Sequence, residues 1–134
     1  MKIEATVRSA LNQHDVIVST NDTMKQLSVN AKANGRGSDI NGGEFLFLSL
    51  ATCFCNDVYR EAAKRKMHID RVNVTVSGYF GAEGEPATGI SYNVEVWSAL
   101  ASKTEIDELI DYVDRIAEVH RTLREGVEVK LERT

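Results

Sequence analysis

The stretch GGEFLFLSLATCFC, residues 42–55, decides how this chain folds. No Gly or Pro occurs from Glu44 to Met67, so the run can continue as one long helix. The first half of this helix is apolar on every face. A helix that is apolar all round must be covered by protein, so we predict that its first half, which contains Cys53, is wrapped.

The second half of the same helix, NDVYREAAKRKM, has a different pattern. Val58, Ala62 and Ala63 share one side, and charged residues occupy the other. This half is therefore expected to reach solvent with its charged face. Its basic residues are Arg60, Lys64, Arg65 and Lys66, and cations in the last turns of a helix offset the negative end of the helix dipole. We interpret them in that way and not as a binding patch.

A glycine-rich loop, NGRGSDINGG at residues 34–43, precedes the helix and holds four of the nine glycines. It lacks the Gly-Lys-Ser/Thr of a phosphate loop, which argues against nucleotide binding. Asn41 can cap the helix, and Glu44 stands three residues later, where a capping box needs a carboxylate.

The remaining segments predict an antiparallel α+β fold. Alternation of apolar and polar residues indicates three short strands near the N-terminus, a long hairpin after the helix and a last strand near the C-terminus. A second helix begins at the capping pair Ser102 and Glu105 and is broken near Gly126. The expected strands are Lys2–Val7, His14–Ser19, Thr23–Ala31, Ile69–Phe80, Ile90–Ala99 and Val127–Leu131. No βαβ series occurs, so a parallel sheet is not expected.

Size and composition indicate one domain over residues 1–134. The formal net charge of −4 makes nucleic acid an improbable partner. The run Phe45–Cys55 is about half of the ~20 residues that span a bilayer, so we expect no membrane segment. The start, MKIEATVRS, lacks the pattern of a secretory signal, and we expect a cytoplasmic protein.

No cofactor or metal is expected either. His14, His68 and His120 are far apart in the sequence and form no paired ligand motif. Cys53 and Cys55 supply two thiols without a second pair. On a helix these two residues point about 200° apart, so a disulfide between them is not expected. A cysteine among Phe, Leu and Ala is either a small inert apolar residue or, given a nearby cation or donor, a reactive thiol.

The segments GGEFLFLSLATCF and MHIDRVNVTVSGYF, together with the ending AEVHRTLREGVEVKLE, resemble the OsmC/Ohr family of osmotically inducible and organic hydroperoxide resistance proteins. This resemblance implies an intertwined homodimer of antiparallel sheets with a long central helix and a second, C-terminal helix. It also implies a thiol-dependent peroxidase, in which a helix-borne cysteine attacks an organic hydroperoxide. In that family a second cysteine resolves the product, and an arginine and a glutamate activate the thiolate.

By position, Cys53 matches the peroxide-reacting cysteine. The place of the resolving cysteine falls at or near Ala117, and no cysteine follows Cys55. Without that residue the sulfenic acid must be reduced by an external thiol. The activating glutamate should stand at Gly43, so Glu44 matches the adjacent position. It is either an auxiliary residue of the site or only a cap of the helix.

Three further residues are candidates for an auxiliary role. Arg8 and Arg36 are the candidates for the activating arginine. His120 lies three residues beyond Ala117, and an imidazole can activate a thiol. The alternative for His120 is a solvent-facing or capping residue near a helix end.

The sequence thus leaves three hypotheses. The first is a peroxidase that uses Cys53 and an external thiol reductant on organic hydroperoxides. The second is a non-peroxidatic OsmC-like homodimer that binds a small hydrophobic ligand. The third is a chain in which Cys53 has only a structural role.

Overall fold

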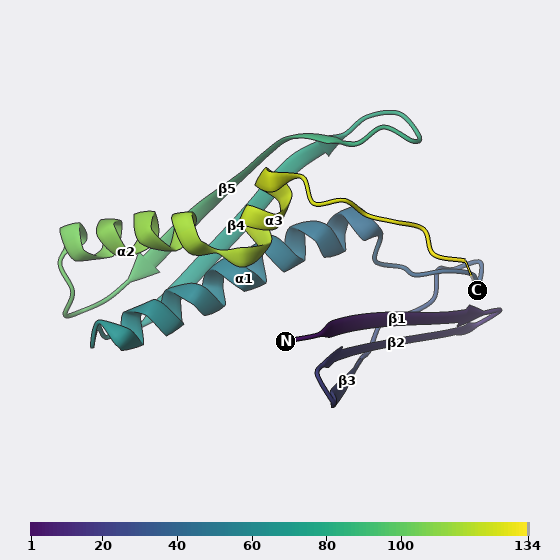
Figure 1. Ribbon diagram of the computed structural model, residues 1–134, viewed down its shortest axis with the longest axis horizontal. Coiled ribbons are helices and arrows are strands. Elements are labelled where there is room, and N and C mark those ends of the chain that lie inside the picture. Colours follow the sequence, from purple (N-terminus) through teal and green to yellow (C-terminus); the bar gives the residue numbers. More distant parts are fainter. Residues whose placement is uncertain (134) are drawn as a thin grey trace. The chain divides into compact units, whose positions relative to one another are not determined.

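The computed structural model describes residues 1–133 and contains two compact units, Met1–Phe45 and the residues from Leu46 onward. Within this part of the chain the elements are helices and antiparallel strands, which confirms the predicted α+β class (Figure 1). That residues 1–134 form a single domain stays a prediction.

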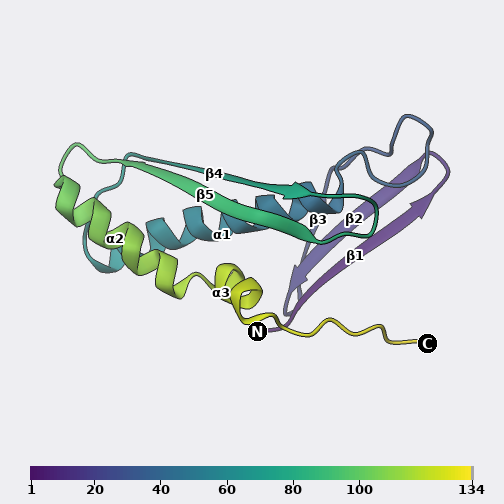
Figure 2. The same cartoon turned by 90° about the horizontal axis from the view of Figure 1, so that it is seen from above.

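The N-terminal unit contains a three-stranded antiparallel sheet of β1 (Ile3–Ala10), β2 (Gln13–Thr20) and β3 (Thr23–Leu27), drawn in purple in Figures 1 and 2. The tight turns between these strands contain Asn12 and Asn21, whose φ angles are 59° and 50°. Asn adopts this left-handed conformation more readily than most residues, and it suits a two-residue hairpin turn. The third strand ends at Leu27, four residues before the predicted end.

Helix α1 spans Gly42–Lys64 and begins with the predicted capping box. The Asn41 backbone N–H donates to Glu44 Oε2 at 2.8 Å, and the Glu44 backbone N–H donates to Asn41 Oδ1 at 2.9 Å. These bonds satisfy amides that have no partner within the helix. The helix ends where Lys66 takes a left-handed φ of 55°.

The hairpin of β4 (Arg71–Phe80) and β5 (Ala87–Trp97) follows α1. Its register shifts between Ser77 and Tyr79, on either side of Gly78. A Cβ atom at Gly78 would lie 2.8 Å from Cζ of Phe47, so only glycine lets α1 approach the hairpin this closely. Helices α1 and α2 both lie along this hairpin (Figures 1 and 2).

The core of this unit lies between α1, the hairpin and α2 (Lys103–Ile116). Helix α2 begins with the capping box predicted at Ser102 and Glu105. The core consists of Phe54, Val58, Ala62, Leu109, Val113 and Ala117, against which inward-facing hairpin residues such as Val72, Val74, Val94 and Val96 pack. The apolar spacing seen in both helices therefore corresponds to the buried faces.

Two sequence-based expectations at the C-terminal end are wrong. The expected single helix is two helices, because the chain turns at the buried Ala117 before α3 (Glu118–Glu125) begins. Gly126 ends α3 with a left-handed φ of 64°, as the break in the pattern predicted. The predicted last strand, Val127–Leu131, is not a strand: Val129 is 96% exposed, and a strand needs a paired neighbour for its backbone.

The two halves of α1 stand differently against the prediction. Leu48 in the first half is 54% exposed within the described chain, so the wrapping of this half by protein stays a prediction. In its second half Ala63 is exposed, whereas Asp57 and Glu61 are buried. Buried carboxylates are tolerated only where cations pair with them, and both of these are paired.

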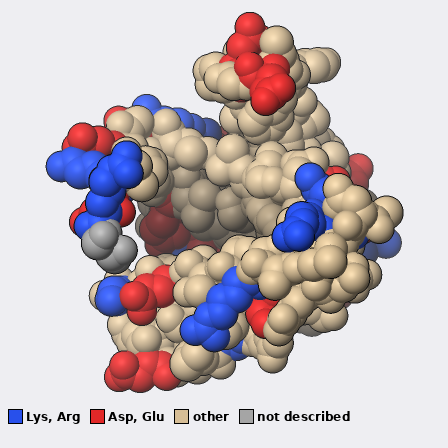
Figure 3. Space-filling model, turned by 90° about the vertical axis from the view of Figure 1, so that its right-hand side faces the viewer, with Lys and Arg blue, Asp and Glu red and all other residues tan. Residues whose placement is uncertain are grey.

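Charged side chains of both signs are distributed over the face shown in Figure 3 without a large area of one sign. No helix within residues 1–133 combines the length and apolarity needed to cross a membrane.

Candidate active site

Cys53 is partly buried on α1, and its sulfur faces two carboxylates. The Sγ atom lies 3.7 Å from Oδ2 of Asp57, one helical turn later, and 3.9 Å from Oε2 of Glu118 at the start of α3. The spacing of four residues places Cys53 and Asp57 on the same helix face. The turn at Ala117 brings Glu118 to that face from the other side.

Arg60 supplies the positive charge of this cluster. Its Nη1 atom lies 2.8 Å from Oδ1 of Asp57 and 3.6 Å from Oε1 of Glu118. Its Nε atom donates to Oε1 of Glu61 at 3.0 Å, and Lys64 reaches the same oxygen at 2.9 Å. Arg60 and Lys64 therefore do more than offset the helix dipole, because they pair with carboxylates that are buried.

These surroundings keep the thiol of Cys53 protonated. Burial raises its pKa above the ordinary value, and the charges of Asp57 and Glu118 raise it further, while a hydrogen bond with the backbone of Val119 opposes them. Burial and the neighbouring Glu118 also raise the pKa of Asp57, against the pull of Arg60. Cys53 is thus a protonated thiol beside two carboxylates that can accept its proton. The cation of the cluster, Arg60, pairs with these carboxylates and does not stabilise a thiolate directly.

Cys55 points into a different region of the C-terminal unit. It lines a cavity with Ala51, Thr52, Asn56 and Val74, whereas Cys53 contacts Asp57 and Glu118. Both cysteines are free, as the opposed directions on one helix require.

The place given to the missing second cysteine, at or near Ala117, contains a core residue and a carboxylate. Ala117 itself is fully buried, and the next residue, Glu118, is the one that faces Cys53. A group that can accept a proton or a hydrogen bond therefore lies where a resolving thiol was expected.

His120 is buried, so its solvent-facing alternative is wrong. Its ring lies against Tyr92 and Phe54, with centroid distances of 4.7 and 5.6 Å. Burial, with the charge of Arg124, lowers the pKa of His120, and so the imidazole is neutral at pH 7. A role of His120 in activating Cys53 stays a prediction.

The other auxiliary candidates belong to the N-terminal unit. Glu44 caps α1 through the bonds with Asn41. Arg8 is exposed in β1, paired in register with Asp15, and Arg36 is exposed in the glycine-rich loop. Roles for Glu44, Arg8 and Arg36 in activating Cys53 stay predictions.

The sulfur of Cys53 and the carboxylate oxygens of Asp57 and Glu118 lie within 4.8 Å of one another. Such a donor set suits a divalent transition ion in principle. Here, however, Arg60 already pairs with both carboxylates and occupies the role of the cation. The cluster therefore gives no support to a metal site.

Comparison with known proteins agrees with this architecture. The family model described as OsmC-like protein matches residues 35–132 of this sequence, which is most of the chain. The chain belongs to the OsmC-like protein family. Comparison with curated protein sequences gives no match.

Solved OsmC-like structures have the same fold. An OsmC-like protein from Mycoplasma pneumoniae has a TM-score of 0.62 and 22% identity, covering 90% of this chain and 87% of its own. The organic hydroperoxide resistance protein OhrB of Bacillus subtilis has a TM-score of 0.57 and 19% identity, covering 98% and 97%. An organic hydroperoxide resistance protein from Legionella pneumophila has a TM-score of 0.59 and 19% identity, covering 97% and 94%.

Sequence reasoning missed the partners of the thiol in this OsmC-like chain. Asp57 and Arg60 stand four and seven residues after Cys53, so helical spacing alone could have placed them on one face. Glu118 carried no such signal, because its approach depends on the turn at Ala117.

Proposed function

We propose that this OsmC-like protein reduces organic hydroperoxides at Cys53 and takes its electrons from an external thiol. The observation that carries this proposal is a partly buried thiol whose sulfur lies 3.7 Å from the carboxylate of Asp57, with Arg60 paired to that carboxylate. A carboxylate beside the sulfur can accept the thiol proton, and the thiolate formed in this way is the nucleophile. Two of the similar structures are described as organic hydroperoxide resistance proteins.

The first step oxidises the sulfur. The Sγ atom of Cys53 bonds to the terminal oxygen of the hydroperoxide ROOH as the O–O bond breaks. The thiol proton passes to the carboxylate of Asp57, the alkoxide takes up a proton and leaves as ROH, and Cys53 becomes a sulfenic acid. Arg60 stabilises the negative charge that develops in this cluster.

The second step restores the thiol. One external thiol condenses with the sulfenic acid, which releases water and forms a mixed disulfide with Cys53. A second external thiol then attacks the sulfur atom that the first external thiol contributed to the mixed disulfide. This step frees Cys53 and releases the oxidised reductant as a disulfide. An external reductant is required because no cysteine follows Cys55 in the sequence.

We test the proposal with cumene hydroperoxide as substrate and dithiothreitol as reductant. Replacement Cys53→Ser should abolish peroxide consumption, and the matched replacement Cys55→Ser on the same helix should leave it nearly unchanged. A sulfenic acid trap should label Cys53, and without dithiothreitol the residue should progress to sulfinic acid. Equal turnover by wild type and Cys53→Ser would rule out Cys53 as the nucleophile.

A second function is favoured by the raised pKa of Cys53, which lowers its thiolate fraction at neutral pH. In this alternative the protein is a non-peroxidatic homodimer that binds a small hydrophobic ligand. A wild-type protein that leaves cumene hydroperoxide unconsumed at every pH up to 9 would favour this alternative over the peroxidase.

We further propose that the protein is a homodimer in which the exposed face of α1 is covered. Leu48 and Tyr59 are 54% and 44% exposed on this helix. Replacement Leu48→Asp should shift the sedimentation coefficient from dimer to monomer, because it places a charge in the apolar contact. Leu100→Asp, at a position 81% exposed outside the helices, is the control that should remain dimeric. A wild-type monomer at micromolar concentration would contradict the proposal.

A further inference from the structure

Two carboxylates act on any molecule that reaches the sulfur of Cys53. Asp57 Oδ2 lies 3.7 Å from Sγ, and Glu118 Oε2 lies 3.9 Å from it. A molecule that reacts with this sulfur must approach it to about 3.5 Å, so its neighbouring atoms come within several ångström of both carboxylates. The charges of these carboxylates can therefore select among the molecules that react with Cys53.

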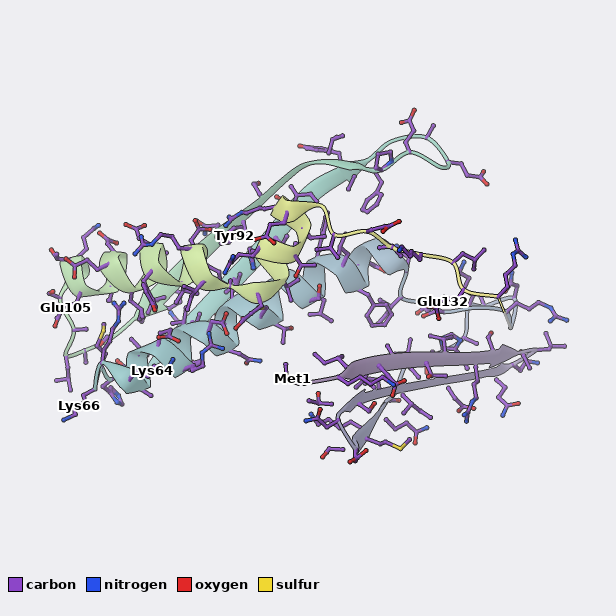
Figure 4. All side chains as sticks on the ribbon, in the orientation of Figure 1. Met1, Lys64, Lys66, Tyr92, Glu105 and Glu132 are labelled. Atoms are coloured by element: carbon purple, nitrogen blue, oxygen red, sulfur yellow. The ribbon has the colours of Figure 1, made fainter. Side chains whose placement is uncertain are left out.

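The two carboxylates are not neutralised equally. Arg60 Nη1 lies 2.8 Å from Asp57 but 3.6 Å from Glu118. The same guanidinium donates through Nε to Glu61, and Lys64, labelled at the end of α1 in Figure 4, also pairs with Glu61. No other cation in the described part of the chain forms an ion pair with Glu118. Glu118 is therefore the less neutralised of the two charges beside the thiol.

Glu118 also differs from the other carboxylates in its exposure. Its side chain is 67% exposed, whereas Asp57 and Glu61 are buried. A molecule that arrives from solvent thus meets the charge of Glu118, while the other two carboxylates are covered and paired with cations. An uncompensated charge of this kind attracts opposite charges and repels like ones.

We propose that Glu118 selects the thiol reductant of Cys53 by charge, so that a small thiol carrying an amine is preferred and a thiol carrying an acidic group is disfavoured. This inference rests on the proposed function, which requires an external thiol, and it adds the chemical class of that thiol. The ammonium group of an aminothiol lies two carbons from its sulfur, so it is attracted to Glu118 while the sulfur attacks. An acidic group in the same place brings a like charge to Glu118.

The reductive step can be measured without peroxide. In a Cys55→Ser background, methyl methanethiosulfonate converts Cys53 to a methyl disulfide. An added thiol RSH then bonds to the methyl-bearing sulfur, the bond to the Cys53 sulfur breaks, and the thiol proton passes to Cys53, which gives RS–SCH3 and the free cysteine. The probes are cysteamine, 2-mercaptoethanol and 2-mercaptoethanesulfonate, which carry an amine, a neutral hydroxyl and a sulfonate. Mass spectrometry follows the loss of the methyl disulfide.

The decisive quantity is the ratio of the cysteamine rate to the 2-mercaptoethanesulfonate rate. The leaving group, the Cys53 thiolate, is the same for both thiols, so a change in its pKa cancels in this ratio. Relative to 2-mercaptoethanol, Glu118→Gln should slow cysteamine and speed 2-mercaptoethanesulfonate, so the ratio should fall about three- to tenfold. Glu125→Gln, which makes the same change of charge on the same helix, should leave it nearly unchanged.

An unchanged ratio in Glu118→Gln would overturn the inference, and so would an equal fall in Glu125→Gln. Failure of methyl methanethiosulfonate to label Cys53 would overturn it as well, because the inference requires a sulfur that a small thiol can reach. Gln has nearly the shape of Glu and the side chain is exposed, so Glu118→Gln should fold. Failure of the proposed peroxidase is a separate result, in which cumene hydroperoxide stays unconsumed.

Discussion

Replacement of Glu118 by Gln should make Cys53 react faster. The carboxylate oxygen of Glu118 lies 3.9 Å from the sulfur, and its charge is one of the causes that raise the pKa of Cys53. Two unit charges about 4 Å apart interact by on the order of 4 kcal/mol at an effective dielectric constant of about 20. Glu118 is exposed and Arg60 lies nearby, so most of this energy is screened. We therefore expect a gain of about three- to tenfold in reaction rate at pH 7.

The assay is the rate of reaction with iodoacetamide between pH 6 and pH 10, in a Cys55→Ser background where Cys53 is the sole thiol. In Glu118→Gln the rate profile should move to lower pH, because less negative charge opposes the thiolate. The difference from the parent protein should shrink in high salt. Glu125→Gln is the matched control, since Glu125 is exposed on the same helix and pairs with Arg121.

An unchanged profile for Glu118→Gln would refute the reasoning, and so would a shift to higher pH. An equal shift in Glu125→Gln would show that the effect comes from the net charge of the protein. Only a shift confined to Glu118→Gln supports a direct contact between this carboxylate and the sulfur.

Three further predictions concern stability and can be measured by urea unfolding. Phe54→Ala should lower the free energy of unfolding by about 3–5 kcal/mol, because Phe54 is fully buried at the centre of the core, and Met24→Ala at a 68% exposed position should cost little. Ser102→Ala should cost about 1 kcal/mol through loss of the α2 cap, and an unchanged midpoint would contradict that role. The pKa of His120 is lowered in the folded state, so the unfolded chain binds its proton first as the pH falls below about 6.5. Stability should therefore drop from pH 7.5 to pH 5.5, and this drop should be smaller in His120→Phe.

Much of the fold could be predicted from local patterns. The capping pairs at Asn41 and Ser102 marked the helix starts, and alternation of residues marked the hairpin, because these signals depend on neighbours in the sequence. The family could be recognised for the same reason, since the segment around Cys53 and the order of elements are properties of the sequence. Cys53 itself was therefore a candidate from sequence, although its surroundings were not.

Only the tertiary structure decided what lies around the thiol and around His120. The turn at Ala117 splits the expected helix and brings Glu118 to Cys53 and His120 to Tyr92, across more than 20 residues of sequence in each case. No periodicity encodes these contacts, because they follow from how α1, β5 and α3 pack. The expected strand at Val127–Leu131 was wrong for a related reason: alternation makes a segment suitable for a sheet, but a strand forms only where another backbone lies beside it.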